Sequence, residues 1–163
     1  MPDARLKSKI SSNGKDSIEL YVPRLFAKAQ KALSHAIAPS SNFRVGAALL
    51  TSNGRMFSGC NIESPVYLGL CAERVALFKG LSEGVRQFLI LAIVSQESIP
   101  LLPCGTCRQL LWEFAPELRI LVSINGKIHS YHLKDLLPIP FERKGRGPFR
   151  TPHTPVLRNT LLS

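Results

Sequence analysis

The chain has 163 residues, 45% of them hydrophobic, and it carries a formal net charge of +10. This length fits one domain that buries most of its apolar surface, and four cysteines are too few for a disulfide-stapled scaffold. No apolar run reaches the roughly 20 residues that cross a bilayer, and the basic N-terminus lacks the apolar stretch of a secretory signal, so we expect a cytoplasmic protein with reduced thiols.

The first half of the chain predicts a helix, a hairpin and a second helix. We expect an amphipathic helix over residues 18–37, because apolar side chains recur there at the spacing of one helix face: Leu25, Ala29, Leu33 and Ala36. Residues 45–50 and 56–62 have the character of two strands, joined by Asn53-Gly54, a pair typical of tight hairpin turns. A second helix is expected over residues 71–83, with Gly84 as its stop.

The second half continues the alternation of strands and helices. Residues 88–94 form a continuous apolar run, typical of a central strand buried on both faces. A helix is expected over 104–114, a second hairpin over 120–131 around Asn125-Gly126, and a short helix over 133–137. This order predicts an α/β protein, a three-layer α/β/α fold with a mixed sheet of about five strands.

The positive charge is concentrated at the two ends of the chain. Residues 1–15 carry a net charge of +3 and residues 142–163 carry +4, which leaves +3 of the total +10 for the rest. We therefore divide the chain into a basic N-terminal extension (1–17), a catalytic domain (18–141) and a basic C-terminal tail (142–163). Basic tails can bind nucleic acid or other polyanions, or they can serve as solvated or oligomer-contacting ends.

The most informative pattern is a split set of three cysteines. Cys71 starts one expected helix, two residues before Glu73, and Cys104 and Cys107 lie in the first turn of another. Helix N-termini favour thiolates, and the i, i+3 spacing of the second pair places both sulfurs on one face. Three thiolates can hold Zn²⁺ and leave a fourth position open, as catalytic zinc sites do. The alternative is a structural zinc or three buried thiols.

Glu73 is the expected proton carrier of this site. Zinc lowers the pKa of a bound water towards neutrality, and a neighbouring carboxylate can take the proton, which typically accelerates a reaction about 10²–10⁴-fold. A free Glu beside a Pro-Cys-x-x-Cys element is typical of zinc-dependent nucleobase deaminases. Three thiolates leave the zinc site with a charge near −1, and Arg74 and Arg108, which each follow a ligand-bearing segment, are candidates to compensate it.

From about residue 20 to 141 the chain resembles cytidine deaminases. The matching motifs are 38–49, 59–63, Cys71-Ala72-Glu73-Arg74, 103–109 and 136–141. The resemblance implies an enzyme, a zinc-dependent hydrolase of pyrimidine salvage that converts cytidine and deoxycytidine to uridine and deoxyuridine. It further implies a homotetramer that takes a small-molecule nucleoside as its substrate. We expect no membrane partner, because no apolar run is long enough to cross a bilayer.

The resemblance also implies roles for single residues. Zinc would be held by Cys71, Cys104 and Cys107, protons would be carried by Glu73, and the zinc thiolates would accept hydrogen bonds from Arg74 and Gln109.

Five further residues would contact the nucleoside. Phe43 would meet the pyrimidine ring, the Ala72 backbone the base carbonyl, and Asn61 and Glu63 the sugar 3′-hydroxyl, while Phe141 would reach a neighbouring subunit's site. Without the resemblance, the two phenylalanines read as core aromatics, Asn61 as a strand-end residue and Glu63 as a solvated acid.

The chain departs from the family pattern at three places and leaves other functions open. Ser40 replaces a Tyr, Leu102 replaces a Ser or Thr, and the segment 64–70 is one residue short before the zinc cysteine. The short segment favours, as a second hypothesis, a deaminase of a cytosine nucleoside analogue such as blasticidin S. The basic tails suggest two further hypotheses, a polynucleotide cytosine deaminase and a noncatalytic zinc-stabilised nucleic-acid-binding module.

Overall fold

A computed structural model of the whole chain describes residues 20–66, 68–97 and 101–142. The N-terminal extension and the C-terminal tail from residue 143 onward lie outside the described residues. Within them, no helix combines the length and the apolar character that a membrane span requires.

A five-stranded sheet forms the centre of the molecule, in the order β2-β1-β3-β4-β5. The strands are β1 (Val45–Thr51), β2 (Met56–Cys60), β3 (Phe88–Ser95), β4 (Arg119–Ile124) and β5 (Lys127–His132). Only the β3–β4 pair is parallel, and the other three pairs are antiparallel, so the sheet is mixed as expected. The apolar run after residue 87 forms β3, the central strand.

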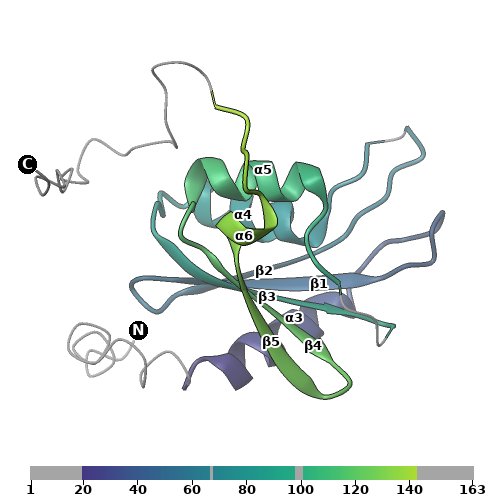
Figure 1. Cartoon of the computed structure of the whole chain (residues 1–163). Helices are drawn as coiled ribbons and strands as arrows, with labels where there is room; N and C mark the ends of the chain where they lie inside the picture. The colour runs from purple at the N-terminus through teal and green to yellow at the C-terminus, as the bar shows by residue number, and fades with distance from the viewer. Residues whose placement is uncertain (1–19, 67, 98–100, 143–163) are drawn as a thin grey trace, which may run out of the picture.

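Helices cover both faces of this sheet (Figure 1). Helix α3 (Val22–Leu33) lies on one face, and α4 (Ala72–Ser82) and α5 (Gly105–Phe114) lie on the other, while the single turn α6 (Leu133–Leu136) follows β5. The sheet and its two helical layers confirm the predicted α/β fold with helices on both faces.

The core is divided between the two faces of the sheet. Alternate residues of β1 point to opposite sides: Ala47 and Leu49 pack in the cluster beneath α4 and α5, and Ala48 and Leu50 pack with α3. All seven residues of β1 are buried, which explains why its sequence lacks the polar alternation of a half-exposed strand.

Two predicted elements are shorter than expected. Helix α3 begins at Val22, with Pro23 in its first turn, and ends at Leu33 rather than at residue 37. Strand β2 ends at Cys60 rather than at residue 62, because Ile62 leaves the main sheet and makes isolated bridges with Ile37 and Leu70. The second hairpin turns as predicted, since Asn125 and Gly126 both have positive φ.

Candidate active site

The N-termini of α4 and α5 bring the three cysteines together. Cys71 is the N-cap of α4 and Cys104 the N-cap of α5, both with extended backbones, and Cys107 lies in the first turn of α5. Their sulfur atoms all lie within 4.8 Å of one another. Among the residues that the structure describes, no histidine or carboxylate joins this group.

The spacing of the sulfurs fits a zinc ion. Zn–S bonds of about 2.3 Å at tetrahedral angles place two sulfurs about 3.8 Å apart. The Sγ atoms of Cys71 and Cys104 are 3.9 Å apart. The residues present therefore suit Zn²⁺, with a fourth position left for a small ligand.

Charge, hydrogen bonding and burial shift the pKa values of Cys71 and Cys107 in opposite directions. A hydrogen bond from the Cys107 thiol and the nearby Arg74 lower the pKa of Cys71 to about 5. The same hydrogen bond, burial and the negative charge of Glu73 raise the pKa of Cys107. Cys71 is therefore the more readily deprotonated of these two thiols, and metal binding would displace the thiol protons that remain.

Glu73 lies in the first turn of α4 with only 5% of its surface exposed. Burial raises its pKa to about 7, and the Cys71 thiolate adds to the shift. A carboxyl group that titrates near neutral pH can both accept and donate a proton, which is what a general acid–base residue must do.

The two arginines that follow the ligand-bearing segments have different partners. The Arg74 guanidinium donates to the Cys71 sulfur at 3.5 Å and to the Gly69 carbonyl at 3.0 Å. Arg108 instead donates to the carbonyl oxygens of Pro103 and Leu136, at 2.7 and 2.9 Å. Of the two candidates, Arg74 is therefore the cation beside the thiolates, whereas Arg108 supports the backbone around α5.

Gln109 also differs from the expectation that it donates to a thiolate. Its side-chain nitrogen donates to the Phe141 carbonyl at 2.9 Å and to Glu113 at 3.3 Å, and its oxygen accepts from the Phe141 amide at 2.8 Å. Both amide hydrogens of Gln109 are thus engaged away from the cysteines.

The residues expected to bind the sugar lie beside the start of α4. Ile62 and Leu70 exchange two backbone hydrogen bonds of 2.9 Å, which places the segment 61–63 next to the residue before Cys71. The Asn61 side chain accepts from the Val45 amide at 2.8 Å and donates to the Phe43 carbonyl at 2.7 Å. In this arrangement Asn61 holds the backbone on both sides of Arg44.

Glu63 is bound to a loop that sequence reasoning did not connect with it. Its carboxylate accepts hydrogen bonds from the Ser40 amide at 2.8 Å, the Ser41 amide at 3.1 Å and the Ser41 hydroxyl. The Ser41 oxygen also accepts from the Phe43 amide at 3.1 Å. Ser41 therefore links the expected sugar-binding acid to the backbone of Phe43, and its place two residues before Phe43 was the signal for such a turn.

Phe43, Ala72 and Phe141 differ in burial. The Phe43 ring is half-buried and packs against the core cluster beneath α4 and α5, and Ala72 is fully buried in that cluster. Phe141 is 71% exposed, so it is no core aromatic of a single chain.

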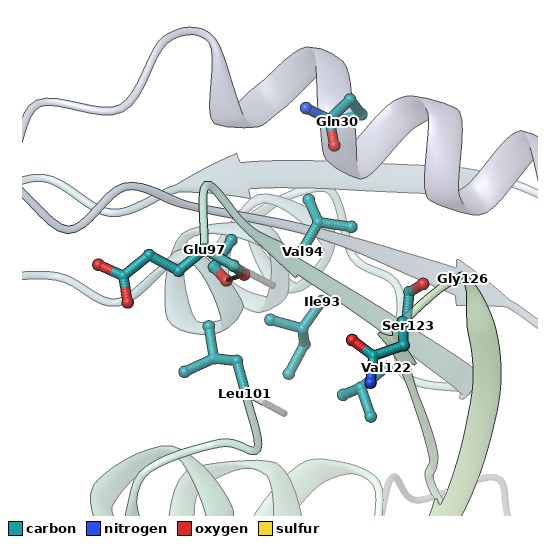
Figure 2. Close-up of a pocket in the computed structure, with 10 residues that line it drawn as sticks. Gln30, Ile93, Val94, Glu97, Leu101, Val122, Ser123 and Gly126 are labelled. Carbon is teal, nitrogen blue, oxygen red and sulfur yellow. Dashed lines mark hydrogen bonds between the residues drawn. The ribbon is translucent and has the colours of Figure 1, made fainter. Parts of the chain in front are cut away.

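A separate cavity of about 180 Å³ lies at the carboxyl ends of β3 and β4 (Figure 2). Leu101, Ile93 and Val122 supply apolar walls, and Ser123 and Gln30 are among its polar residues. None of the three cysteines and neither Glu73 nor Phe43 lines it. The cavity is thus distinct from the cysteine site.

The fold and the site together define an α/β protein with a three-cysteine site that suits zinc. A sequence profile of the "cytidine and deoxycytidylate deaminase zinc-binding region" matches residues 22–123. A cytidine deaminase of Sporosarcina psychrophila is 42% identical over 126 residues, which cover 76% of this chain and 93% of that protein. The chain belongs to the cytidine deaminase family.

A solved structure agrees with this assignment, and a more distant relative represents another kind of deaminase. A crystal structure of cytidine deaminase from Burkholderia pseudomallei superposes with a TM-score of 0.69 at 42% identity, covering 72% of this chain and 97% of that one. A blasticidin-S deaminase of Bacillus cereus is 33% identical over 110 residues, covering 61% of this chain and 77% of that protein.

Proposed function

We propose that this enzyme hydrolyses cytidine and deoxycytidine to uridine and deoxyuridine and releases ammonia. The observation that carries the proposal is a buried carboxyl group, Glu73, beside three sulfurs that are spaced for zinc. Family membership and the identity to named cytidine deaminases support the choice of substrate.

In this mechanism the protein holds the ion through Cys71, Cys104 and Cys107. Zinc, when bound, would supply a Lewis acid that activates the attacking water. Glu73 takes one proton from the attacking water and delivers it to ring nitrogen N3 of cytosine while the water oxygen bonds to C4. It then takes the second proton from the new C4 hydroxyl and passes it to the amine, so that the C4–N bond breaks, ammonia leaves and the C4 carbonyl remains. Its pKa of about 7 suits both directions of transfer. Arg74 offsets part of the negative charge of the thiolates.

The nucleoside would be bound by the loop in front of β1 and the segment after β2. Phe43 packs against the pyrimidine ring, the Ala72 backbone reads the base carbonyl, and Asn61 and Glu63 bind the 3′-hydroxyl. The hydrogen bonds from Ser40 and Ser41 to Glu63 support this role, because they fix the carboxylate relative to Phe43.

We further propose a cytoplasmic homotetramer that acts in pyrimidine salvage, in which Phe141 reaches the nucleoside site of a neighbouring copy. The support in this chain is the Phe141 ring, which is 71% exposed while its backbone is held by Gln109.

The test is turnover of cytidine and deoxycytidine by zinc-loaded protein, followed as conversion to uridine and deoxyuridine. We expect both substrates to react and the Glu73→Gln variant to lose about 10²–10⁴-fold in rate while it retains zinc. Undiminished uridine production by that variant would rule out the proposed proton carrier.

A second candidate is deamination of a cytosine nucleoside analogue such as blasticidin S. The segment 64–70 favours it, because it differs from the family pattern, and its Val66 and Leu68 side chains are 69% and 75% exposed beside the site. Turnover of blasticidin S with a higher kcat/KM than that of cytidine would establish this alternative. Equal or better turnover of cytidine would exclude it.

A further inference from the structure

The segment that follows α6 forms no helix or strand of its own. Residues 137–142 form neither element, and Figure 1 shows this stretch running past α5. Ile139 and Phe141 in this segment are 87% and 71% exposed. Apolar packing against the described residues therefore does not explain how these two side chains are held in place.

Side chains of α5 hold the segment through its backbone. Gln109 accepts from the Phe141 amide at 2.8 Å and donates to the Phe141 carbonyl at 2.9 Å, as a neighbouring β-strand would do. One turn further along the helix, the Trp112 indole donates to Glu142 at 3.1 Å. Residues three apart on a helix share a face, so one face of α5 binds two consecutive residues of the segment.

Gln109 is well suited to fix the position of Phe141. Its amide satisfies the donor and the acceptor of one residue at the same time, which sets both the distance and the orientation of the backbone. Glu113, one turn along α5, accepts the second amide hydrogen of Gln109 at 3.3 Å and holds the amide plane.

We propose that Gln109 is a positioning residue that presents the Phe141 ring outward to a nucleoside bound in a neighbouring copy of the chain. The proposal rests on the proposed function, in which that ring contacts substrate. It assigns Gln109 to substrate binding across subunits and gives it no part in holding zinc.

The test compares Gln109→Met, which keeps the length of the side chain and removes both hydrogen bonds, with Phe141→Ala and with the double variant. We expect Gln109→Met to raise the KM for cytidine about tenfold, with kcat and zinc content within twofold of the parent. The double variant should be no worse than Phe141→Ala, because both changes remove the same contact. The proposal would be overturned if the effects of the two single variants on KM multiplied in the double variant. Loss of zinc together with a fall in kcat in Gln109→Met would also overturn it.

Amide hydrogen exchange at Phe141 tests the contact without any reaction. Exchange should become roughly fivefold faster in Gln109→Met, and it should stay slower in Gln109→Glu, which keeps an acceptor for the Phe141 amide. Gln96→Met is the matched control, because the Gln96 side chain donates to the Asn42 carbonyl and not to Phe141. Unchanged exchange at Phe141 in Gln109→Met would overturn only the role proposed for Gln109. A parent protein that does not deaminate cytidine would overturn the proposed function.

Discussion

Arg74 connects the metal ligands to the segment that precedes them. One guanidinium nitrogen, Nη2, donates both to the Cys71 sulfur and to the Gly69 carbonyl, so it joins the two ends of the turn into α4. We expect Arg74→Lys to weaken zinc binding about 10–100-fold, because the lysine side chain is shorter and places its ammonium farther from the Cys71 sulfur and the Gly69 carbonyl. Competition with a chelator of known affinity measures this change. Arg86→Lys is the control, and similar zinc affinity in both variants would contradict the assignment.

The Glu63 carboxylate gives a second prediction at the scale of single residues. Hydrogen bonds from the Ser41 hydroxyl, the Ser41 amide and the Ser40 amide lower its pKa below the ordinary value of 4.5. Because the folded pKa is the lower one, these bonds stabilise the loop fully above the ordinary carboxyl pKa. That stabilisation is lost as the pH falls through the lowered value.

Ser41→Ala should therefore raise the pKa of Glu63 towards its ordinary value. An NMR titration that follows the side-chain carboxyl carbon measures the shift. Ser64→Ala is the control, since the Ser64 hydroxyl accepts from the Val66 amide and not from this network. Equal Glu63 pKa values in the parent and in Ser41→Ala would show that the hydroxyl bond does not persist in solution.

At the scale of elements, two glycines let helices approach the sheet from opposite sides. A Cβ on Gly59 of β2 would lie 2.6 Å from the Ala72 carbonyl oxygen and 2.6 Å from the Ala76 nitrogen of α4. A Cβ on Gly46 of β1 would lie 2.2 Å from the Ala29 carbonyl oxygen of α3. Neither backbone can yield as a flexible side chain would, so alanine at either position must displace a helix.

Gly59→Ala and Gly46→Ala should each lower the free energy of unfolding by about 1–3 kcal/mol. Only Gly59→Ala displaces the helix that carries Cys71 and Glu73, so it should also reduce zinc content and turnover. Gly46→Ala should keep both, because α3 carries no ligand. Urea titrations and zinc-to-protein ratios distinguish the two, and equal zinc loss in both variants would argue against this coupling.

The order of elements and the contact of Arg74 with a cysteine sulfur could be predicted from the sequence, whereas other long-range side-chain partners could not. Periodic apolar residues and the Asn-Gly turns predicted every strand and helix of the described domain, with errors of a few residues at the ends of α3 and β2. The cysteine spacing predicted the cluster, because two helix N-termini fix where short side chains lie. Arg108 and Gln109 have long side chains, and their partners, Leu136 and Phe141, are more than 25 residues away in the chain. Such contacts depend on tertiary packing that local pattern does not encode.

At the scale of the whole molecule, the charge of the tails separates nucleoside chemistry from nucleic-acid binding. The proposed site needs none of the basic residues between 143 and 158, while a polyanion would bind through them. In a full-length variant, all five lysine and arginine residues of this stretch are changed to Gln: Arg143, Lys144, Arg146, Arg150 and Arg158.

This variant should deaminate cytidine with kcat/KM within twofold of the parent, because a free nucleoside carries no phosphate for these residues to bind. It should elute from a heparin column at lower salt, since fewer counterions are released on binding. Single-stranded DNA and RNA that contain cytosine are the decisive additional substrates. One possible result is that the parent deaminates cytosine in single-stranded DNA or RNA and that the variant loses this activity while cytidine turnover persists. That result would assign the C-terminal tail to polynucleotide deamination. Absence of editing in both proteins, with cytidine turnover intact, is the result we expect of a free-nucleoside deaminase.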